Sequence, residues 1–140
     1  MQNFHSSAVE LNGRAVLIKG QSGSGKSSLA LQLILLGAKL IADDQTEVFL
    51  EQNKVFLRAP ASLPNGLEIR GIGIVKAPFC EKAELKFVID LSQCESERLP
   101  NPLGRRINIL GYSFPFYFFQ DIKDPANAIY ALLEFGLLEV

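Results

Sequence analysis

Short apolar runs separated by turn residues cover most of the chain and predict a domain rich in β-strands. Two pairs of these runs predict β-hairpins: residues 9–11 with 15–18, and residues 47–50 with 54–58. The dipeptide Asn12-Gly13 between the first two runs favours a tight hairpin turn. Three further runs have strand character, at residues 67–76, 85–90 and 107–119. Pro115 in the last run is typical of an edge strand, because proline cannot donate to a strand ladder.

One helix is predicted directly after residue 27, where apolar side chains recur at helical spacing through Leu29, Leu33, Ile34 and Leu36. Gly37 is expected to end this helix in a left-handed conformation. Residues 39–42 then predict a short buried strand. Together with the strand at residues 15–18, this succession predicts a βαβ unit whose two strands run parallel.

A second helix is predicted near the C-terminus. Asp124 is placed to be its N-cap, and Pro125 suits the first helical position. Its apolar face includes Ile129, Leu132 and Leu133, with Phe135 as a further candidate. The pattern as a whole predicts one α/β domain over residues 1–140, with many strands and two helices.

Composition narrows the class of protein. Of 140 residues, 48% are hydrophobic, and 14 basic side chains balance 15 acidic ones. This balance argues against a broad nucleic-acid-binding or polybasic membrane surface. No apolar stretch is long enough for a membrane helix, and the first residues lack the pattern of a secretory signal. Cys80 and Cys94 have no zinc-site or disulfide-framework spacing, which favours a reducing cytoplasm.

The sequence GQSGSGKS matches the P-loop pattern GxxxxGK[ST], between an apolar strand and an amphipathic helix. In a P-loop, backbone N–H groups and the helix N-terminus surround the phosphates of a nucleotide such as ATP. Lys26 can reach the β- and γ-phosphates, and the Ser27 hydroxyl can bind Mg²⁺. The alternative is a glycine-rich loop that only caps a helix. The predicted phosphate-binding residues are Gly20, Gln21, Ser22, Gly23, Ser24, Gly25, Lys26 and Ser27.

Two adjacent carboxylates, Asp43 and Asp44, end the strand at residues 39–42. If this strand lies beside the P-loop strand, both carboxylates stand near the γ-phosphate. A carboxylate there can hold magnesium or accept a proton from an attacking hydroxyl. Neighbouring residues of a strand point to opposite faces, so the two need not share one role, and we assign Asp43 to the metal. The alternative is a solvated turn with a helix-capping residue.

The chain also resembles a known family. His5, the segment GQSGSGKSS, residues 40–44 and the segment LEIRGIGI at 67–74 have the order and spacing of the HPr kinase/phosphorylase family. The chain is similar to the catalytic domain of bacterial HPr(Ser) kinases, which resembles the core of ATP-dependent phosphoenolpyruvate carboxykinase. This implies a P-loop domain with a mixed sheet and few helices. The resemblance covers about residues 4–100 and is to the short form without an N-terminal domain.

The resemblance implies roles for individual residues. Lys26 would bind the transferred phosphate, and Asp44 would deprotonate the acceptor serine. Ser27 and Glu68 would be magnesium ligands. His5 and Arg98 would lie in or near the active site.

The LEIRGIGI segment also has a physical interpretation of its own. If residues 67–74 are extended, Glu68 and Arg70 share one face, where they could bind metal and phosphate. The alternative is an amphipathic surface strand with a salt-bridged polar face.

Residues 113–119 read SFPFYFF, where family members that also remove the phosphate carry a basic, glycine-containing motif. The resemblance therefore implies a kinase without phosphorylase activity, unless Arg105 and Arg106 compensate. The aromatic side chains are expected either to pack in the core or to form a partner surface. The family commonly forms hexamers, which favours a homo-oligomer.

The implied function is an ATP- and Mg²⁺-dependent protein serine kinase that phosphorylates the phosphocarrier protein HPr in the cytoplasm. Such a kinase regulates the phosphotransferase system and carbon metabolism. Two alternatives stay open at this point. One is a nucleotide-binding sensor without transfer activity, and the other is a small-molecule kinase.

Overall fold

The computed structural model describes residues 1–138. Its helices are α1 (Lys26–Leu35) and α2 (Pro125–Phe135). Its strands are β1 (Gln2–Phe4), β2 (Ser7–Leu11), β3 (Arg14–Lys19), β4 (Lys39–Ala42), β5 (Thr46–Glu51), β6 (Lys54–Arg58), β7 (Gly66–Ile69), β8 (Gly73–Lys76), β9 (Lys82–Asp90), β10 (Arg106–Ile109) and β11 (Tyr112–Phe118). The predicted mixed α/β class with few helices is confirmed for these residues.

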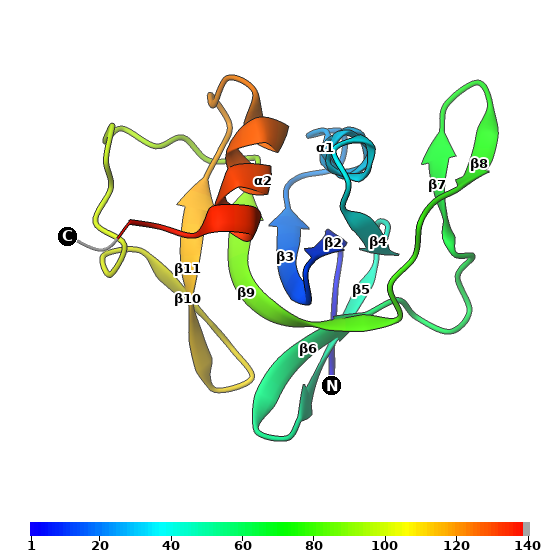
Figure 1. Cartoon of the computed structure of the whole chain (residues 1–140), viewed down its shortest axis with the longest axis horizontal. Helices are drawn as coiled ribbons and strands as arrows, with labels where there is room; N and C mark the ends of the chain where they lie inside the picture. Colours follow the sequence, from blue (N-terminus) through cyan, green and yellow to red (C-terminus); the bar gives the residue numbers. More distant parts are fainter. Residues whose placement is uncertain (139–140) are drawn as a thin grey trace.

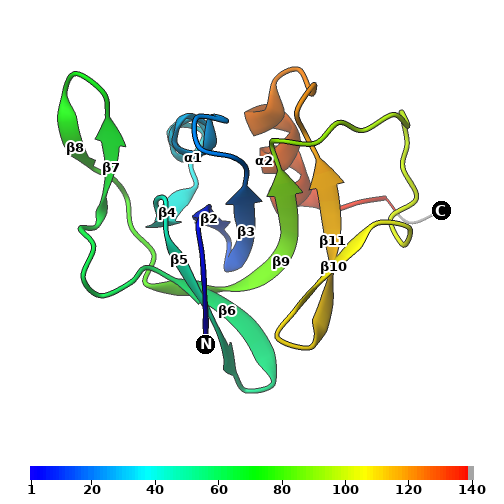
Figure 2. The same ribbon diagram turned by 180° about the vertical axis from the view of Figure 1, so that it is seen from behind.

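Nine of the strands form one strongly curled sheet (Figure 1). Its main order is β1-β5-β6-β9-β3-β2-β4, with β11 beside β9 and β10 beside β11. β7 and β8 form a separate two-stranded ribbon that projects at the opposite end of the molecule from β10 and β11. The view from behind shows the same separation (Figure 2).

Both predicted hairpins are confirmed, because local turn residues determine them. In the β2–β3 turn, Asn12 and Gly13 have φ angles of 54° and 81°. In the β5–β6 turn, Gln52 and Asn53 have φ angles of 52° and 61°. Two consecutive left-handed residues are the requirement of the hairpin turn whose twist matches that of the flanking strands.

β4 does not lie beside β3, which was the condition for placing both aspartates near the γ-phosphate. β2 pairs antiparallel with both of these strands and lies between them. One edge of β3 is occupied by its hairpin partner β2 and the other by the parallel strand β9, so β3 has no free edge and β4 pairs with the outer edge of β2. β3 and β4 still run in the same direction, as the βαβ pattern predicted.

β3 is buried on both faces of the sheet, which explains its continuous apolar sequence. Val16 and Ile18 pack into a core beneath α1 and α2. Ala15 and Leu17 pack into a second core on the opposite face, together with side chains of the curled strands β5, β6 and β9. β3 is therefore held in place from both sides just before the loop that follows it.

The aromatic run is part of this packing. Residues 107–119 form the β10–β11 hairpin rather than one strand. Phe114 and Phe116 pack against the second core, whereas Tyr117 and Phe119 pack against the first. The prediction that these rings contribute to core packing is confirmed.

α2 covers the first core through Ile129 and Leu133, which are buried as predicted. Asp124 occupies the N-cap position with a φ of 55°, but its side chain makes no capping hydrogen bond. Phe135 lies outside the core, because 80% of its surface is exposed. No helix among residues 1–138 has the length and apolar character needed to span a bilayer.

Two leucines of α1 provide a matched test of the first core. Leu33 has no exposed surface, whereas Leu35 is 77% exposed on the same helix. We expect Leu33→Ala to lower the free energy of unfolding by about 2–5 kcal/mol, because it leaves a cavity between the helices and the sheet. Leu35→Ala should change it by less than about 0.5 kcal/mol. Urea unfolding of both variants checks this, and equal losses would contradict the packing described.

Candidate functional site

The segment of residues 20–27, here called the glycine loop, runs from the carboxyl end of β3 into the first two residues of α1. Gly23 and Gly25 have φ angles of 82° and 102°, in the left-handed region that other residues rarely adopt. A Cβ atom at Gly20 would press against the Ser24 hydroxyl across the loop. The curve therefore favours glycine at Gly23 and Gly25 through its backbone angles, and it leads into the amino end of α1, where unpaired N–H groups favour an anion.

Lys26 lies inside the curve of the glycine loop. Its side chain is only 6% exposed, and Nζ donates to the carbonyl oxygens of Gly20 at 3.1 Å and Gln21 at 3.3 Å. These contacts hold the ammonium against the loop backbone. An anion in the loop would meet this positive charge directly.

Ser27 and Asp43 form the closest pair of predicted site residues. Ser27 Oγ donates to Asp43 Oδ1 at 2.7 Å. Ser7 Oγ donates to the same oxygen at 3.0 Å and accepts the backbone N–H of Asp44 at 3.3 Å. Sequence reasoning missed Ser7, because a serine at the start of a strand carries no signal of its own.

His5 and Asp44 form a second pair, with 3.3 Å between His5 Nε2 and Asp44 Oδ1. Both side chains are open to solvent, at 59% and 62% exposed, so the contact contributes little to stability. Asp44 has a φ of 71°, a left-handed conformation that aspartate tolerates. An exposed carboxylate beside a histidine is available to a group that arrives from solution.

The strand order explains why His5 and Ser7 reach this place. β2 is antiparallel to β3 and β4, so its amino end lies beside their carboxyl ends, with Ser7 opposite Ile18 and Ala8 opposite Ala42. Residues from three separate parts of the chain thereby meet at one edge of the sheet.

The donor set around Ser27 suits magnesium. A hydroxyl and a carboxylate oxygen 2.7 Å apart are the oxygen ligands that this ion prefers. Within residues 1–138, no three His, Cys, Asp or Glu side chains gather as a metal-binding group. Magnesium typically takes one or two protein ligands, and substrate phosphates and water supply the remainder. The protein's share of a site would therefore be Ser27 and Asp43.

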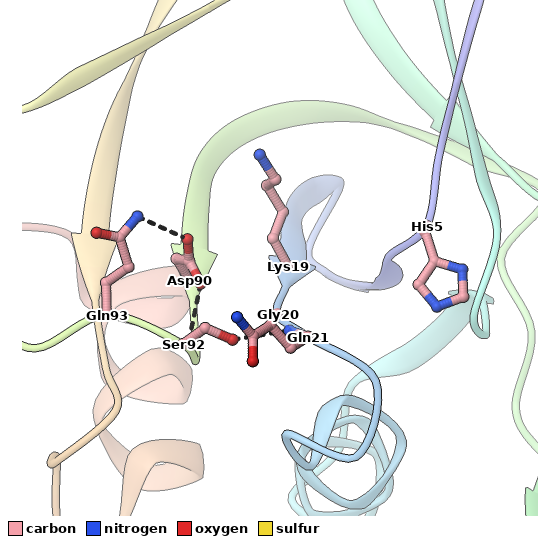
Figure 3. A pocket seen from close by; sticks show the side chains of 7 residues that line it. All are labelled: His5, Lys19, Gly20, Gln21, Asp90, Ser92 and Gln93. Carbon is pink, nitrogen blue, oxygen red and sulfur yellow. Dashed lines mark hydrogen bonds between the residues drawn. The ribbon is translucent and has the colours of Figure 1, made fainter.

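A cleft of about 410 Å³ opens beside the glycine loop, at the ends of β3 and β9 (Figure 3). His5 stands on one side of it, Asp90 and Gln93 stand on the other, and Lys19 rises between them. The cleft is lined by His5, Lys19, Gly20, Gln21, Asp90, Ser92 and Gln93.

Asp90 connects β9 to the glycine loop. Its two oxygens accept from Ser92 N at 2.8 Å and Gln93 Nε2 at 3.2 Å. Ser92 Oγ in turn accepts the N–H of Gln21 at 2.7 Å, which fixes the start of the loop. The sequence predicted the strand but not that Asp90 would help to fix the glycine loop. The sequence feature that could have indicated this is an aspartate directly after the apolar run 87–89.

Glu68 lies in β7, in the β7–β8 ribbon. Leu67 is buried in the first core and Ile69 lines a cavity against α1, whereas Glu68 is exposed and does not line the cleft. Residues 67–74 are not extended throughout, so the condition for Glu68 and Arg70 to share one face is not met: the chain turns after Ile69, and Ile72 N donates back to Ile69 O at 3.0 Å. The metal-binding role of Glu68 stays a prediction.

Arg98 lines a different cavity of about 270 Å³, formed by the loop after β9 and the aromatic residues of β11. Arg98 does not line the cleft beside the glycine loop, and its role also stays a prediction.

Arg105 and Arg106, which could compensate for the basic motif that residues 113–119 lack, both contact neighbouring residues. The Arg105 guanidinium pairs with Glu95 and lies 4.1 Å from the centre of the Phe118 ring. Hydrogen bonds from the Glu97 backbone and from Arg105 lower the pKa of the Glu95 carboxyl. Arg106 donates to the hydroxyl and carbonyl oxygens of Ser113.

Comparisons with known proteins agree with the resemblance found in the sequence. Residues 1–112 match the family model described as HPr Serine kinase C-terminal domain. The HPr kinase/phosphorylase of Levilactobacillus brevis is 47% identical over 75 residues, 53% of this chain and 24% of that protein. The HPr kinase/phosphorylase of Variovorax paradoxus is 38% identical over 112 residues, 71% of this chain and 35% of that protein.

A solved structure is also similar. The Hpr(Ser) kinase/phosphatase from Coxiella burnetii superposes with a TM-score of 0.80 and 28% sequence identity, covering 95% of this chain and 88% of that one. The matched part is only about a quarter to a third of the length of the two curated relatives. The comparisons support the family and the fold of the domain.

Neighbouring serines give a matched test of the Ser7 bridge. Ser7→Ala leaves the Asp44 N–H without its acceptor and removes a donor to Asp43, so we expect a loss of about 1–3 kcal/mol in unfolding free energy. Ser6 Oγ is buried without a hydrogen-bond partner, so Ser6→Ala should cost less than about 0.5 kcal/mol. Thermal and urea unfolding would measure both, and a larger loss for Ser6→Ala would refute the assignment.

Proposed function

Because the chain belongs to the HPr kinase/phosphorylase family, we propose that it is an ATP- and Mg²⁺-dependent protein kinase that phosphorylates a serine of the phosphocarrier protein HPr. The proposal rests mainly on two pairs of side chains that lie beside the glycine loop. Ser27 lies against Asp43, and the exposed Asp44 lies against His5. These are the groups that a phosphoryl transfer from nucleotide to hydroxyl requires.

The glycine loop would hold the phosphates of ATP through its N–H groups and the amino end of α1. Lys26 would exchange its contacts with the loop carbonyls for contacts with phosphate oxygens, which places positive charge where negative charge develops. Ser27 and Asp43 would hold magnesium, which neutralises the phosphates and fixes their orientation.

Asp44 would accept the proton of the acceptor serine as its oxygen attacks the γ-phosphate. The carboxylate is 62% exposed, so a loop of a protein substrate can reach it without a rearrangement of the core. His5 would fix the orientation of the carboxylate from 3.3 Å. The cleft beside His5, with a volume of about 410 Å³, would receive the acceptor segment.

The contacts of the two arginines support a kinase without phosphorylase activity. Removal of phosphate from a phosphoserine by phosphorolysis needs a site that holds inorganic phosphate as the nucleophile. Arg105 pairs with Glu95 and stacks on Phe118, and Arg106 is bonded to Ser113. Neither guanidinium lines the cleft.

The family also suggests the setting of this activity. Phosphorylation of HPr would regulate the phosphotransferase system and carbon metabolism in the cytoplasm. A homo-oligomer, a hexamer by family resemblance, fits the exposed apolar side chains at the end of the chain, where Phe135, Leu137 and Leu138 are 80%, 56% and 87% exposed.

A nucleotide-responsive regulator without transfer activity is the second candidate. The contacts of Arg105 and Arg106 also favour this candidate. A chain that has lost the phosphate-removing reaction but keeps the glycine loop could still bind a nucleotide and respond to it. The two candidates differ in one measurement, which is transfer of phosphate to serine.

Two substitutions test the kinase directly. Asp44→Asn should lower phosphate transfer from Mg·ATP to HPr by about 10²–10⁴-fold, because an amide cannot accept the proton, while nucleotide affinity stays nearly unchanged. Lys26→Ala should weaken nucleotide binding by about 10–100-fold, because a charge-assisted contact is lost. Radiolabelled transfer and calorimetric titration measure the two effects.

The exposed Asp121, outside the cleft, provides the matched control, so Asp121→Asn should retain full transfer. Transfer that survives Asp44→Asn would remove the proton-accepting role. Tight nucleotide binding without transfer by the unsubstituted chain would favour the regulator.

The absence of phosphorolysis is a separate expectation. Incubation of serine-phosphorylated HPr with inorganic phosphate and the unsubstituted chain should release no pyrophosphate above background, because no arginine is placed in the cleft to bind the nucleophile. A coupled pyrophosphate assay measures this, with forward transfer as the positive control. Release at a rate close to that of the forward reaction would contradict the expectation.

A further inference from the structure

The first peptide unit of the glycine loop is held at both ends. Its carbonyl oxygen, on Gly20, accepts Lys26 Nζ at 3.1 Å. Its N–H, on Gln21, donates to Ser92 Oγ at 2.7 Å. The C=O and N–H of a trans peptide unit lie in one plane and point in opposite directions. Ser92 therefore holds this plane from outside the loop, while Lys26 contacts it from inside.

The place of Ser92 follows from the pairing of β3 with β9. The two strands are parallel, and Leu91 N donates to Lys19 O at 2.9 Å, one residue beyond the last paired residue of β9. In a continued parallel ladder, the N–H of Gln21 would next donate to a backbone carbonyl of the neighbouring chain. It donates to the Ser92 hydroxyl instead. A side chain thus fixes the peptide unit at which the loop leaves the sheet.

Asp90 fixes the serine in turn. Asp90 is only 9% exposed, and its carboxylate oxygens accept from Ser92 N at 2.8 Å and from Gln93 Nε2 at 3.2 Å (Figure 3). Phe119 N donates to the Asp90 carbonyl at 2.9 Å, so the segment after β11 holds the backbone of the same residue. These contacts limit the positions that the Ser92 hydroxyl can take.

Glycine at the first position makes this contact important. Gly20 has no side chain that would limit rotation of the peptide unit after it. Without the Ser92 hydroxyl, the Gln21 N–H would lose its acceptor, and the unit could rotate until Gly20 O points away from Lys26. The ammonium would then keep the Gln21 carbonyl, at 3.3 Å, as its remaining contact in the loop. Its position would be less closely defined.

We propose that Ser92 is a positioning residue for Lys26 and that Asp90 acts through Ser92, a role that rests on the proposed function. Lysine has a flexible side chain, and a ligand that orders it loses affinity to the lost rotamer freedom. Two fixed carbonyls order Lys26 before the nucleotide arrives, so less of this loss falls on binding and transfer.

A double-mutant cycle tests whether Ser92 acts through Lys26. Calorimetry measures the affinity for Mg·ADP of the unsubstituted chain, Ser92→Ala, Lys26→Ala and the double variant. We expect Ser92→Ala to weaken binding by about fivefold when Lys26 is present, because the ammonium is no longer ordered in advance, and by less than about twofold in the Lys26→Ala background. Equal weakening in the two backgrounds, or none in either, would overturn the proposal.

Matched variants separate the hydroxyl from the mere replacement of a serine. Ser92→Thr keeps the hydroxyl and should retain the Mg·ADP affinity of the unsubstituted chain within about twofold. Ser96→Ala removes a serine from an exposed position of the same loop and should also retain it. A loss in Ser96→Ala as large as that in Ser92→Ala would overturn the proposal.

The part of Asp90 has its own test. Asp90→Asn keeps one acceptor oxygen and puts a donor in place of the other, so we expect it to weaken Mg·ADP about as much as Ser92→Ala. The variant with both substitutions should lose no more than Ser92→Ala alone, since both act through one hydroxyl. Additive losses would overturn the statement that Asp90 acts through Ser92.

Transfer kinetics separate this role from a contact with the acceptor, because Ser92 also lines the cleft beside the glycine loop. A positioning role lowers kcat for HPr and leaves its KM within about twofold. A higher KM for HPr in Ser92→Ala, with unchanged kcat and unchanged Mg·ADP affinity, would overturn the proposal and leave the kinase function standing.

Failure of the kinase function has a different signature. If the unsubstituted chain binds Mg·ADP and transfers no phosphate, the kinase fails, and the affinity cycle still decides the role of Ser92. If it binds no Mg·ADP, the phosphate-binding role of the glycine loop fails, and the positioning role fails with it.

Discussion

The insertion of β2 between β3 and β4 is the constraint on which the candidate site depends. Because β2 runs antiparallel to both neighbours, its first residues lie at the edge where the other two strands end. Ser7 can then donate to Asp43 and accept from the Asp44 backbone, and His5 can reach the Asp44 carboxylate. If β4 paired directly with β3, the two aspartates would lie one strand closer to the glycine loop, without the serine that now fixes their positions. The hairpin at Asn12 and Gly13 therefore determines where the residues of the candidate site lie.

The rigidity of this edge follows from burial on both sides of β3. Val16 and Ile18 face the helices, while Ala15 and Leu17 face the curled outer strands, so the strand cannot shift toward either side without opening a core. The glycine loop begins from this fixed point, and the bond from Gln21 N to Ser92 Oγ ties it to β9. Lys26 is oriented by two carbonyls of the same loop. Such prior positioning matters for phosphoryl transfer, since its rate depends mainly on geometry and electrostatics.

The sequence predicted the features that depend on neighbouring residues and missed those that depend on strand order. The two early hairpins, the glycine loop and both helices follow from local turn chemistry and periodicity. The separation of β3 and β4, the Ser7 bridge and the role of Asp90 follow from pairings between distant segments, which no local pattern encodes. In the LEIRGIGI segment, by contrast, a local feature was present in the sequence but was not used. Its alternation predicts a strand correctly, but Gly71 and Gly73, with φ angles of 86° and 131°, turn the chain within it.

Strand order also ties both ends of the glycine loop to the sheet. On one side of β3, its hairpin partner β2 carries β4, whose end brings Asp43 to Ser27 at the far end of the loop. On the other side, β9 ends at Asp90, which accepts from Ser92 N, and Ser92 Oγ accepts the N–H of Gln21 at the start of the loop. The same sheet order that separates β3 from β4 leaves the second edge of β3 to β9, so the loop has one attachment from each side.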